Sequence, residues 1–325
     1  MIKFVDWKKL LGATAILAAL VTTTSASAQS YAAGKTITFI VPYSAGGTSD
    51  TAARVLSEAL EKELGATVQV LNRPGAASQV GLTELINSRP DGLTLAYGVL
   101  PTLLTHYLDP DREAPYKRDS FTPIAMHFQV PNLLAVQASS PYQNVGDLVA
   151  AAKAAPSTIK VGDTGVLGAP HLLVLILQGA ADVKFASVHF QGGAPATTAL
   201  LGGHTDVMSN AVSDVLPYVK TGEFRVLGIA DSARSAALPD VPTLKEQGFE
   251  VFGVSSTAVL APAGVPAEIV AELSAAMERI VSSDAHQAKL RELGITPMYK
   301  SAEGLLESWI EYEEQVGPAL ASAKE

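Results

Sequence analysis

From Lys35 onward, short apolar runs alternate with amphipathic helical patterns, and this alternation constrains the fold more than any other feature of the sequence. Residues 37–41 are apolar except for Thr38, as in a central strand whose sheet is covered on both faces. Residues 49–64 repeat apolar side chains at helical spacing, and Gly65 follows as a helix-ending glycine. The order is strand 37–41, helix 49–64, strand 67–71, a helix containing 83–87 and strand 93–97. Such β-α-β-α-β order predicts parallel strands joined by right-handed crossovers.

The pattern restarts after an extended segment, residues 124–136, which Pro131 interrupts. A second run of elements follows: helix 145–155, strand 159–161, helix 170–177, strand 183–190, helix 197–201 and strands 206–208 and 225–230. The helices after Pro266 and Ser301 suggest no third core, so we expect them to pack on the first lobe. Two extended crossings, near residues 130 and 250, would then join two lobes as a hinge. The expected division is 29–134 and 251–325 for lobe 1 and 135–250 for lobe 2.

The N-terminus has the pattern of a secretory signal peptide. Lys3, Lys8 and Lys9 precede an apolar stretch at residues 10–21, and the small residues 26–28 form an A-x-A cleavage site. We therefore expect residues 1–28 to be removed and the product to be periplasmic; the alternative is a membrane anchor. The 325-residue chain is long enough for two cores, and its formal charge of −9 argues against a nucleic-acid partner. It has no cysteine and so forms no disulfide.

The loop PYSAGGTSD, residues 42–50, joins the first strand to the first helix. It lies at the carboxyl end of a strand, where open α/β sheets bind ligands, and the helix start offers unpaired N–H groups and the positive end of a dipole. Gly46 and Gly47 would let a carboxylate approach the backbone, and Thr48 and Ser49 can donate hydroxyls. Asp50 is expected to cap or brace the loop. The alternative is a purely structural turn.

Four segments carry a resemblance to a known family: PYSAGGTSDTAAR (42–54), LNRPGAASQVG with PDGLTLAYG (71–98), GGAPATTALLGGHTDVM (192–208) and RSAALPDVPTLKEQG (234–248). They resemble the Bug-type periplasmic solute receptors of tripartite tricarboxylate transporters. The resemblance implies an α/β, two-lobed type II (Venus-flytrap) periplasmic binding protein, with a mainly parallel sheet in each lobe. It also implies a monomer that binds a small organic carboxylate, a di- or tricarboxylate or an aromatic acid, and delivers it to one large and one small integral membrane subunit.

The resemblance places the loop at residues 162–171 opposite the first loop, and it matches residues 190–195 to a loop that closes over the ligand. The candidate ligand-binding residues are Tyr43, Ala45, Gly46, Gly47, Thr48, Ser49, Asp163, Thr164, Gly168, Ala169, His171, Phe190, Gln191, Gly192, Gly193, Ala194 and Asn210. Apolar residues such as Val166 and Leu167 replace the Ser, Thr and Asn of the usual family pattern, which predicts a less polar and roomier cleft. The role of Asp163 is left open: its carboxylate either pairs with a ligand amine or hydroxyl, or only caps its own loop.

Several chemistries lack their sequence signatures. The six histidines show no H-x-x-x-H spacing, so no metal site is expected, and no G-x-S-x-G or P-loop motif is present. Without a visible pair of nucleophile and base, an exported enzyme is disfavoured, and no cofactor is expected. The leading hypothesis is a solute receptor that serves a transporter. The alternative is a ligand-sensing periplasmic subunit of a signalling system, which would have the same fold.

Overall fold

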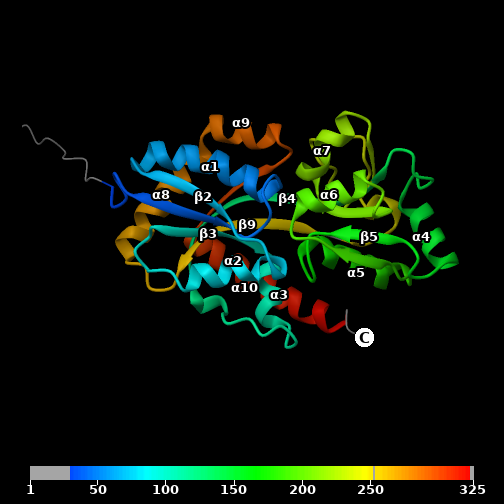
Figure 1. Ribbon diagram of the computed structural model, residues 1–325, viewed down its shortest axis with the longest axis horizontal. Helices are drawn as coiled ribbons and strands as arrows, with labels where there is room; N and C mark the ends of the chain where they lie inside the picture. Colours follow the sequence, from blue (N-terminus) through cyan, green and yellow to red (C-terminus); the bar gives the residue numbers. More distant parts are fainter. Residues whose placement is uncertain (1–29, 252, 323–325) are drawn as a thin grey trace, which may run out of the picture.

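Two α/β lobes lie side by side along the long axis of the molecule in the computed structural model, which describes residues 30–251 and 253–322 (Figure 1). One ten-stranded sheet passes through both lobes in the order β2-β1-β3-β9-β4-β7-β5-β6, with β10 and β8 also paired to β4. The predicted signal peptide, residues 1–28, lies outside the described residues. Within the described ranges, no helix combines the length and apolarity needed to cross a membrane.

The strands are β1 (Thr36–Val41), β2 (Thr67–Asn72), β3 (Thr94–Leu100), β4 (Phe121–Gln137), β5 (Lys160–Asp163), β6 (Ala186–His189), β7 (Val207–Ala211), β8 (Phe224–Ile229), β9 (Val254–Pro262) and β10 (Thr296–Ser301). The α-helices are α1 (Thr48–Leu64), α2 (Gln79–Ile86), α3 (Thr102–Leu108), α4 (Val145–Ala154), α5 (Ala169–Ala181), α6 (Gly193–Leu201), α7 (Val212–Lys220), α8 (Ala267–Ser282), α9 (Asp284–Glu292) and α10 (Ala302–Ser322). Short 3-10 turns lie at Ala76–Ser78, Arg118–Ser120 and Lys245–Gln247.

Each lobe contains the parallel strands that the alternating pattern predicts. In the first lobe β1 pairs in parallel with both β2 and β3, and in the second β5 pairs in parallel with β6 and β7. The other pairs correct the prediction of a mainly parallel sheet, because β9 is antiparallel to β3 and β4, β10 to β4, and β7 and β8 to β4. The sheets are therefore mixed. The long strands β4 and β9 account for this, since each antiparallel pair includes one of them.

The strand β4 joins the two lobes and continues through Pro131. Its first half pairs with β9 as far as Pro131 and Val254, and from Asn132 onward it pairs with β7 in the second lobe. The second crossing runs beside it: Asn132 N–H donates to the Gly253 carbonyl at 2.8 Å, and Gly253 N–H donates to the Ala230 carbonyl at 2.8 Å. The chain thus crosses between the lobes near residues 131 and 253. The finer division into domains at residues 134 and 250 stays a prediction.

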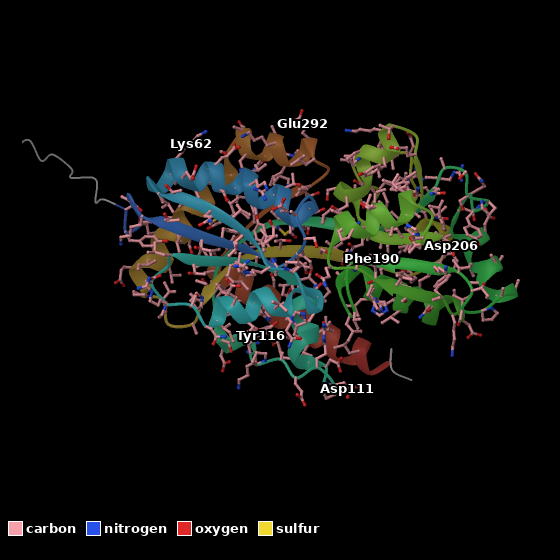
Figure 2. All side chains as sticks on the ribbon, viewed as in Figure 1. Lys62, Asp111, Tyr116, Phe190, Asp206 and Glu292 are labelled. Carbon is pink, nitrogen blue, oxygen red and sulfur yellow. The ribbon has the colours of Figure 1, made fainter. Side chains whose placement is uncertain are left out.

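Helices cover both faces of the sheet. In the first lobe α1, α8 and α9 lie on one face and α2, α3 and α10 on the other, while α6 and α7 lie opposite α4 and α5 in the second lobe (Figure 1). The C-terminal helices pack on the first lobe as predicted: Leu273 of α8 shares a core with α1, and the buried ring of Trp309 on α10 lies 5.9 Å from that of Phe121. Lys62 and Glu292 mark the outer surfaces of α1 and α9 (Figure 2). This packing holds the loops at the strand ends in place between the lobes.

Candidate ligand-binding site between the lobes

A cavity of about 60 Å³ lies where the strand ends of the two lobes meet. Seven of the residues expected from the sequence line it: Tyr43, Gly47, Thr48, Ser49, Thr164, Gly193 and Asn210. Eleven further lining residues were not among the candidates: Ser44, Val99, Thr102, Phe128, Val130, Asn132, Pro170, Ala211, Asp214, Ser255 and Thr257. Most of these lie on β3, β4, β7, β9 and α7, whose convergence depends on the sheet order rather than on any local motif. Val99, Phe128, Val130 and Pro170 give the cavity an apolar wall. The expectation of a cleft that is less polar and roomier than is usual in the family stays a prediction.

The first loop, residues 43–50, is braced from within. Asp50 is 4% exposed and accepts hydrogen bonds from Gly46 N–H at 3.0 Å, Arg54 Nη2 at 2.9 Å and Asn72 Nδ2 at 3.0 Å. Burial alone would raise the pKa of Asp50, but these hydrogen bonds outweigh burial and hold the pKa below its ordinary value. The interpretation of Asp50 as the brace of the loop is confirmed.

The start of α1 contacts the second lobe directly. Thr48 N–H donates to Asp214 Oδ1 at 2.8 Å, and the hydroxyls of Thr48 and Ser213 are 2.6 Å apart. Ser44 donates from both its N–H and its hydroxyl to the Gln191 carbonyl, at 3.0 and 2.9 Å. The lobes are therefore in a closed arrangement, held by hydrogen bonds between the first loop and the second lobe.

Two glycines lie at this close contact. A Cβ atom on Gly47 would lie 3.5 Å from both Ala194 N and Asp214 Oδ1, and one on Gly192 would lie 3.2 Å from Ser44 N. Gly192 also has φ +131°, a conformation that side chains with a Cβ rarely adopt. A larger side chain at Gly47 would thus hold the two lobes apart.

Among the described residues, Asp214 is the acidic side chain at this contact, and no sequence pattern indicated its role. Its carboxylate accepts from the first N–H of α1, and a Cβ on Gly193 would lie 2.1 Å from its Oδ2. It therefore lies between the starts of α1 and α6, one from each lobe. Burial raises the pKa of Asp214 to about 6, against an ordinary value of 3.8, while the hydrogen bonds from Thr48 oppose that rise. A carboxylate on a short helix after β7 carries no motif, so only the fold could reveal it.

The second loop, residues 162–171, binds mainly to itself and to α3. The fully buried Asp163 accepts from Gly165 N–H at 2.9 Å and contacts His189 Nδ1 at 2.9 Å. Ala169 N–H donates to Thr102 Oγ1 at 2.9 Å, and His171 Nδ1 accepts from Leu167 N–H at 2.9 Å. These bonds fit the capping alternative for Asp163. They also leave the start of α5 with few N–H groups for a ligand, particularly because the next residue, Pro170, has none.

The remaining candidates lie away from the cavity lining. Ala45, Asp163, Gly168, Ala169, His171, Phe190, Gln191 and Gly192 do not line it. Gly46 and Ala194 line a second hollow of about 230 Å³ on the other side of the α1–α6 contact, which shares Gly47, Thr48 and Asp214 with the first. Phe190 lies in the second lobe (Figure 2), and its N–H donates to the Asp163 carbonyl at 2.9 Å. A direct ligand contact by any of these residues stays a prediction.

Asp163, His171 and His189 together form the one described group whose side chains could hold a metal ion, with ligand atoms within 4.8 Å of one another. The three residues come from separate segments, so H-x-x-x-H spacing could not reveal them. The Asp163 hydrogen bond raises the pKa of His189, and burial lowers that of His171. A metal ion would have to replace the bonds from His189 to Asp163 and from Leu167 to His171. The group is therefore explained by its hydrogen bonds within the second lobe.

The comparison with known families matches residues 52–318 to the tripartite tricarboxylate transporter family receptor, TctC. The chain belongs to this receptor family. It is 32% identical to the protein BugT of Bordetella pertussis over 274 residues, covering 84% of each chain. It is 29% identical over 286 residues to a protein encoded in the tcbD-tcbE intergenic region of Pseudomonas sp. strain P51, covering 86% of this chain and 84% of the relative. The chain is thus a periplasmic solute-binding receptor of non-enzymatic type.

Solved structures share the same architecture. The R. palustris protein Rpa4515 with adipate matches the receptor with a TM-score of 0.84 at 26% identity, over 89% of this chain and 97% of that one. MatC from Rhodopseudomonas palustris with bound malate matches with a TM-score of 0.83 at 27% identity, over 88% and 98%. The periplasmic binding protein BugD matches with a TM-score of 0.83 at 25% identity, over 89% and 98%. Two of these structural relatives therefore hold dicarboxylates.

Proposed function

We propose that this receptor binds a small organic carboxylate in the cavity between its lobes and delivers it to the large and small integral subunits of a tripartite tricarboxylate transporter. Binding would take place in the periplasm after removal of residues 1–28. The ligand would contact Tyr43, Gly47, Thr48 and Ser49 of the first lobe and Thr164, Gly193 and Asn210 of the second.

One observation carries this proposal: a cavity lies between the lobes, and the carboxyl ends of strands from both lobes line it. This is the edge at which open α/β sheets bind ligands. Closure would exclude water, which strengthens each polar contact inside. A micromolar ligand needs about 8 kcal/mol, and hydrogen bonds to a charged group contribute about 1.5–3 kcal/mol each, so contacts from both lobes are required. The adipate and malate in the structural relatives support a carboxylate as the ligand class.

The ligand class is tested by a thermal-shift screen of the purified receptor against mono-, di- and tricarboxylates, including malate, adipate and aromatic acids. At a concentration of 100 times Kd, a ligand stabilises the folded protein by about 2.7 kcal/mol, which a melting curve resolves easily. We expect at least one acid to raise the melting temperature, with calorimetry confirming one site. A melting temperature unmoved by every acid but raised by another class of compound would contradict the proposal.

Delivery to a transporter needs a separate test in cells. Deleting the gene should abolish uptake of the acid that the screen identifies, and a plasmid copy should restore it. If uptake persists in the deletion strain while a transcriptional response to the acid is lost, the receptor serves a signalling system instead.

A further inference from the structure

We propose that Asp214 selects the ligand: the receptor prefers a small carboxylate that also carries a hydrogen-bond donor, above all an ammonium group, over an unsubstituted acid of the same skeleton. This inference rests on the proposed function and assigns a specificity to the same cavity. Asp214 would accept the donor of the ligand, while the carboxylate of the ligand lies further along the cavity.

The charge of the cavity lining is the first observation. Among the described residues that line it, Asp214 is the only one whose side chain is charged at neutral pH, and neither lysine, arginine nor histidine is present. Tyr43 stays neutral because burial raises its pKa. A dianion would thus enter a cavity that already holds a negative charge and offers no cationic side chain. An amino acid zwitterion would place its positive group beside the only charge there.

The position of the carboxylate is the second observation. Asp214 Oδ1 already accepts from Thr48 N–H at 2.8 Å, and its Oδ2 lies against Gly193 at the start of α6. The place between the two helix starts, where an anionic ligand group would gain most from the helix dipoles, is therefore occupied by the protein's own anion. A ligand carboxylate is left with neutral groups elsewhere in the lining, such as the hydroxyls of Ser49, Thr164 and Thr257.

The unfilled capacity of the carboxylate is the third observation. An ionised carboxylate has about four lone-pair sites, and the described hydrogen bonds to Asp214, from the N–H and the side chain of Thr48, use only part of them. Because Asp214 also lines the cavity, a donor on the ligand can complete its hydrogen bonding. A ligand without a donor would leave the carboxylate less well satisfied after closure excludes water.

The test is calorimetric binding to matched acids of three to six carbons that differ only in one substituent, such as alanine, lactate and propionate, or aspartate, malate and succinate. We expect the wild-type receptor to bind the ammonium acid at least tenfold more tightly than its unsubstituted partner in the series that fits, with the hydroxy acid between them. In Asp214→Asn, which keeps the size and removes the charge, this ratio should fall to about threefold or less.

Asp182→Asn is the matched control, because Asp182 is an exposed residue at the end of α5 and its left-handed backbone suits asparagine equally well. It should keep the wild-type ratio. An unchanged ratio in Asp214→Asn, or tightest wild-type binding of the unsubstituted acid, would overturn the inference and leave the proposed function standing. If Asp214→Asn bound all three acids more tightly than the wild type by the same factor, Asp214 would only repel the ligand carboxylate. That result would also overturn the inference that Asp214 selects the ligand. Binding by no acid at all would overturn the proposed function, and the inference with it.

Discussion

The two glycine-containing loops that face each other across the cavity, residues 43–50 and 162–171, follow strands in the same way but use their N–H groups differently. The first loop directs them across the lobe boundary, since Thr48 donates to Asp214 and Ser44 to Gln191. The second loop satisfies its own groups, through Asp163 and through Thr102 of the neighbouring helix. Two loops of similar local sequence thus have different roles. The first contacts the opposite lobe, whereas the second is held by hydrogen bonds within its surroundings. Changes in the first should alter binding, and changes in the second should alter stability.

The largest expected effect on binding comes from Gly47→Val. A Cβ atom added at Gly47 would lie 3.5 Å from backbone and carboxylate atoms of the second lobe, so the branched methyl groups of valine would prevent closure. We expect at least a hundredfold loss of affinity for the acid that the screen identifies, with cooperative unfolding retained, measured by calorimetry and melting curves.

Gly179→Val is the matched control, because no atom lies within 4 Å of a Cβ placed at Gly179 on α5. Its affinity should match that of the wild type. Wild-type affinity in Gly47→Val would place the ligand away from the first loop.

The corresponding change in the second loop is Asp163→Ala. It removes a fully buried carboxylate and leaves the buried Gly165 N–H without its partner, which costs about 1–3 kcal/mol of stability, while the exposed His189 loses its hydrogen bond to Asp163. Urea unfolding should show this loss, while ligand affinity changes less than about threefold if the loop is a scaffold. The exposed Asp119→Ala, which removes only a surface contact to Lys117, should change stability by less than about 0.5 kcal/mol. A large loss of affinity without loss of stability would make Asp163 a ligand contact.

The pH dependence of stability separates the two loops further. Burial raises the pKa of Asp214 from 3.8 to about 6, so the native state holds this proton more tightly, and its contribution to stability falls as the pH rises from about 4 to 6. The Asp163 hydrogen bond raises the pKa of His189, so that pair contributes fully below about pH 6.5 and is lost as the pH rises through the raised pKa.

Urea unfolding from pH 4 to 8 measures both pH dependences, as the difference in free energy of unfolding between each variant and the wild type. The stability of Asp214→Asn relative to the wild type should rise between pH 4 and 6, by at most about 1.4 kcal/mol per pH unit. His189→Gln should be less stable than the wild type near pH 5.5, and the difference should shrink above pH 7. Curves parallel to the wild type across the whole range would contradict the assigned contacts.

The smallest expected effect comes from Ser44→Ala. It removes the hydroxyl bond to the Gln191 carbonyl and leaves the Ser44 N–H bond to the same oxygen intact. A neutral hydrogen bond contributes about 0.5–1.5 kcal/mol, so affinity should fall between about twofold and tenfold. Calorimetry can resolve this against Ser232→Ala, whose hydroxyl contacts only the adjacent Asp231. An affinity equal to that of the control would mean that this bond does not contribute to the bound state.

The sequence predicts those parts of the fold that depend on local periodicity. The helix expected at residues 49–64 is α1 (Thr48–Leu64), and the three parallel strands of the first lobe pair as expected. Hydrophobic periodicity and end signals fix such elements over ten or more residues. The antiparallel pairing of β4 with β9 joins Phe121 to Pro262, and no local pattern specifies a partner so distant in the chain.

The candidate site shows the same division. The first loop was identified because glycines and hydroxyls at a strand-to-helix junction have a direct physical meaning. Asp214 was missed for two reasons. Helix α7 is short and contains Pro217, so its sequence does not show a clear helical pattern, and the partner of Asp214, Thr48, belongs to the other lobe. The hydrogen bonds of the second loop could not be predicted from its own residues, since Thr102, which accepts from Ala169 N–H, and His189, which contacts Asp163, come from other segments.

The most direct test is native mass spectrometry of the wild-type receptor and Gly47→Val, purified in parallel from the periplasm without refolding. The wild type should carry a small organic acid that denaturation releases, and this mass should be absent from the variant. A wild-type protein that releases a compound without a carboxylate, or a variant that retains the same acid at equal occupancy, would contradict a carboxylate ligand held between the lobes beside the first loop.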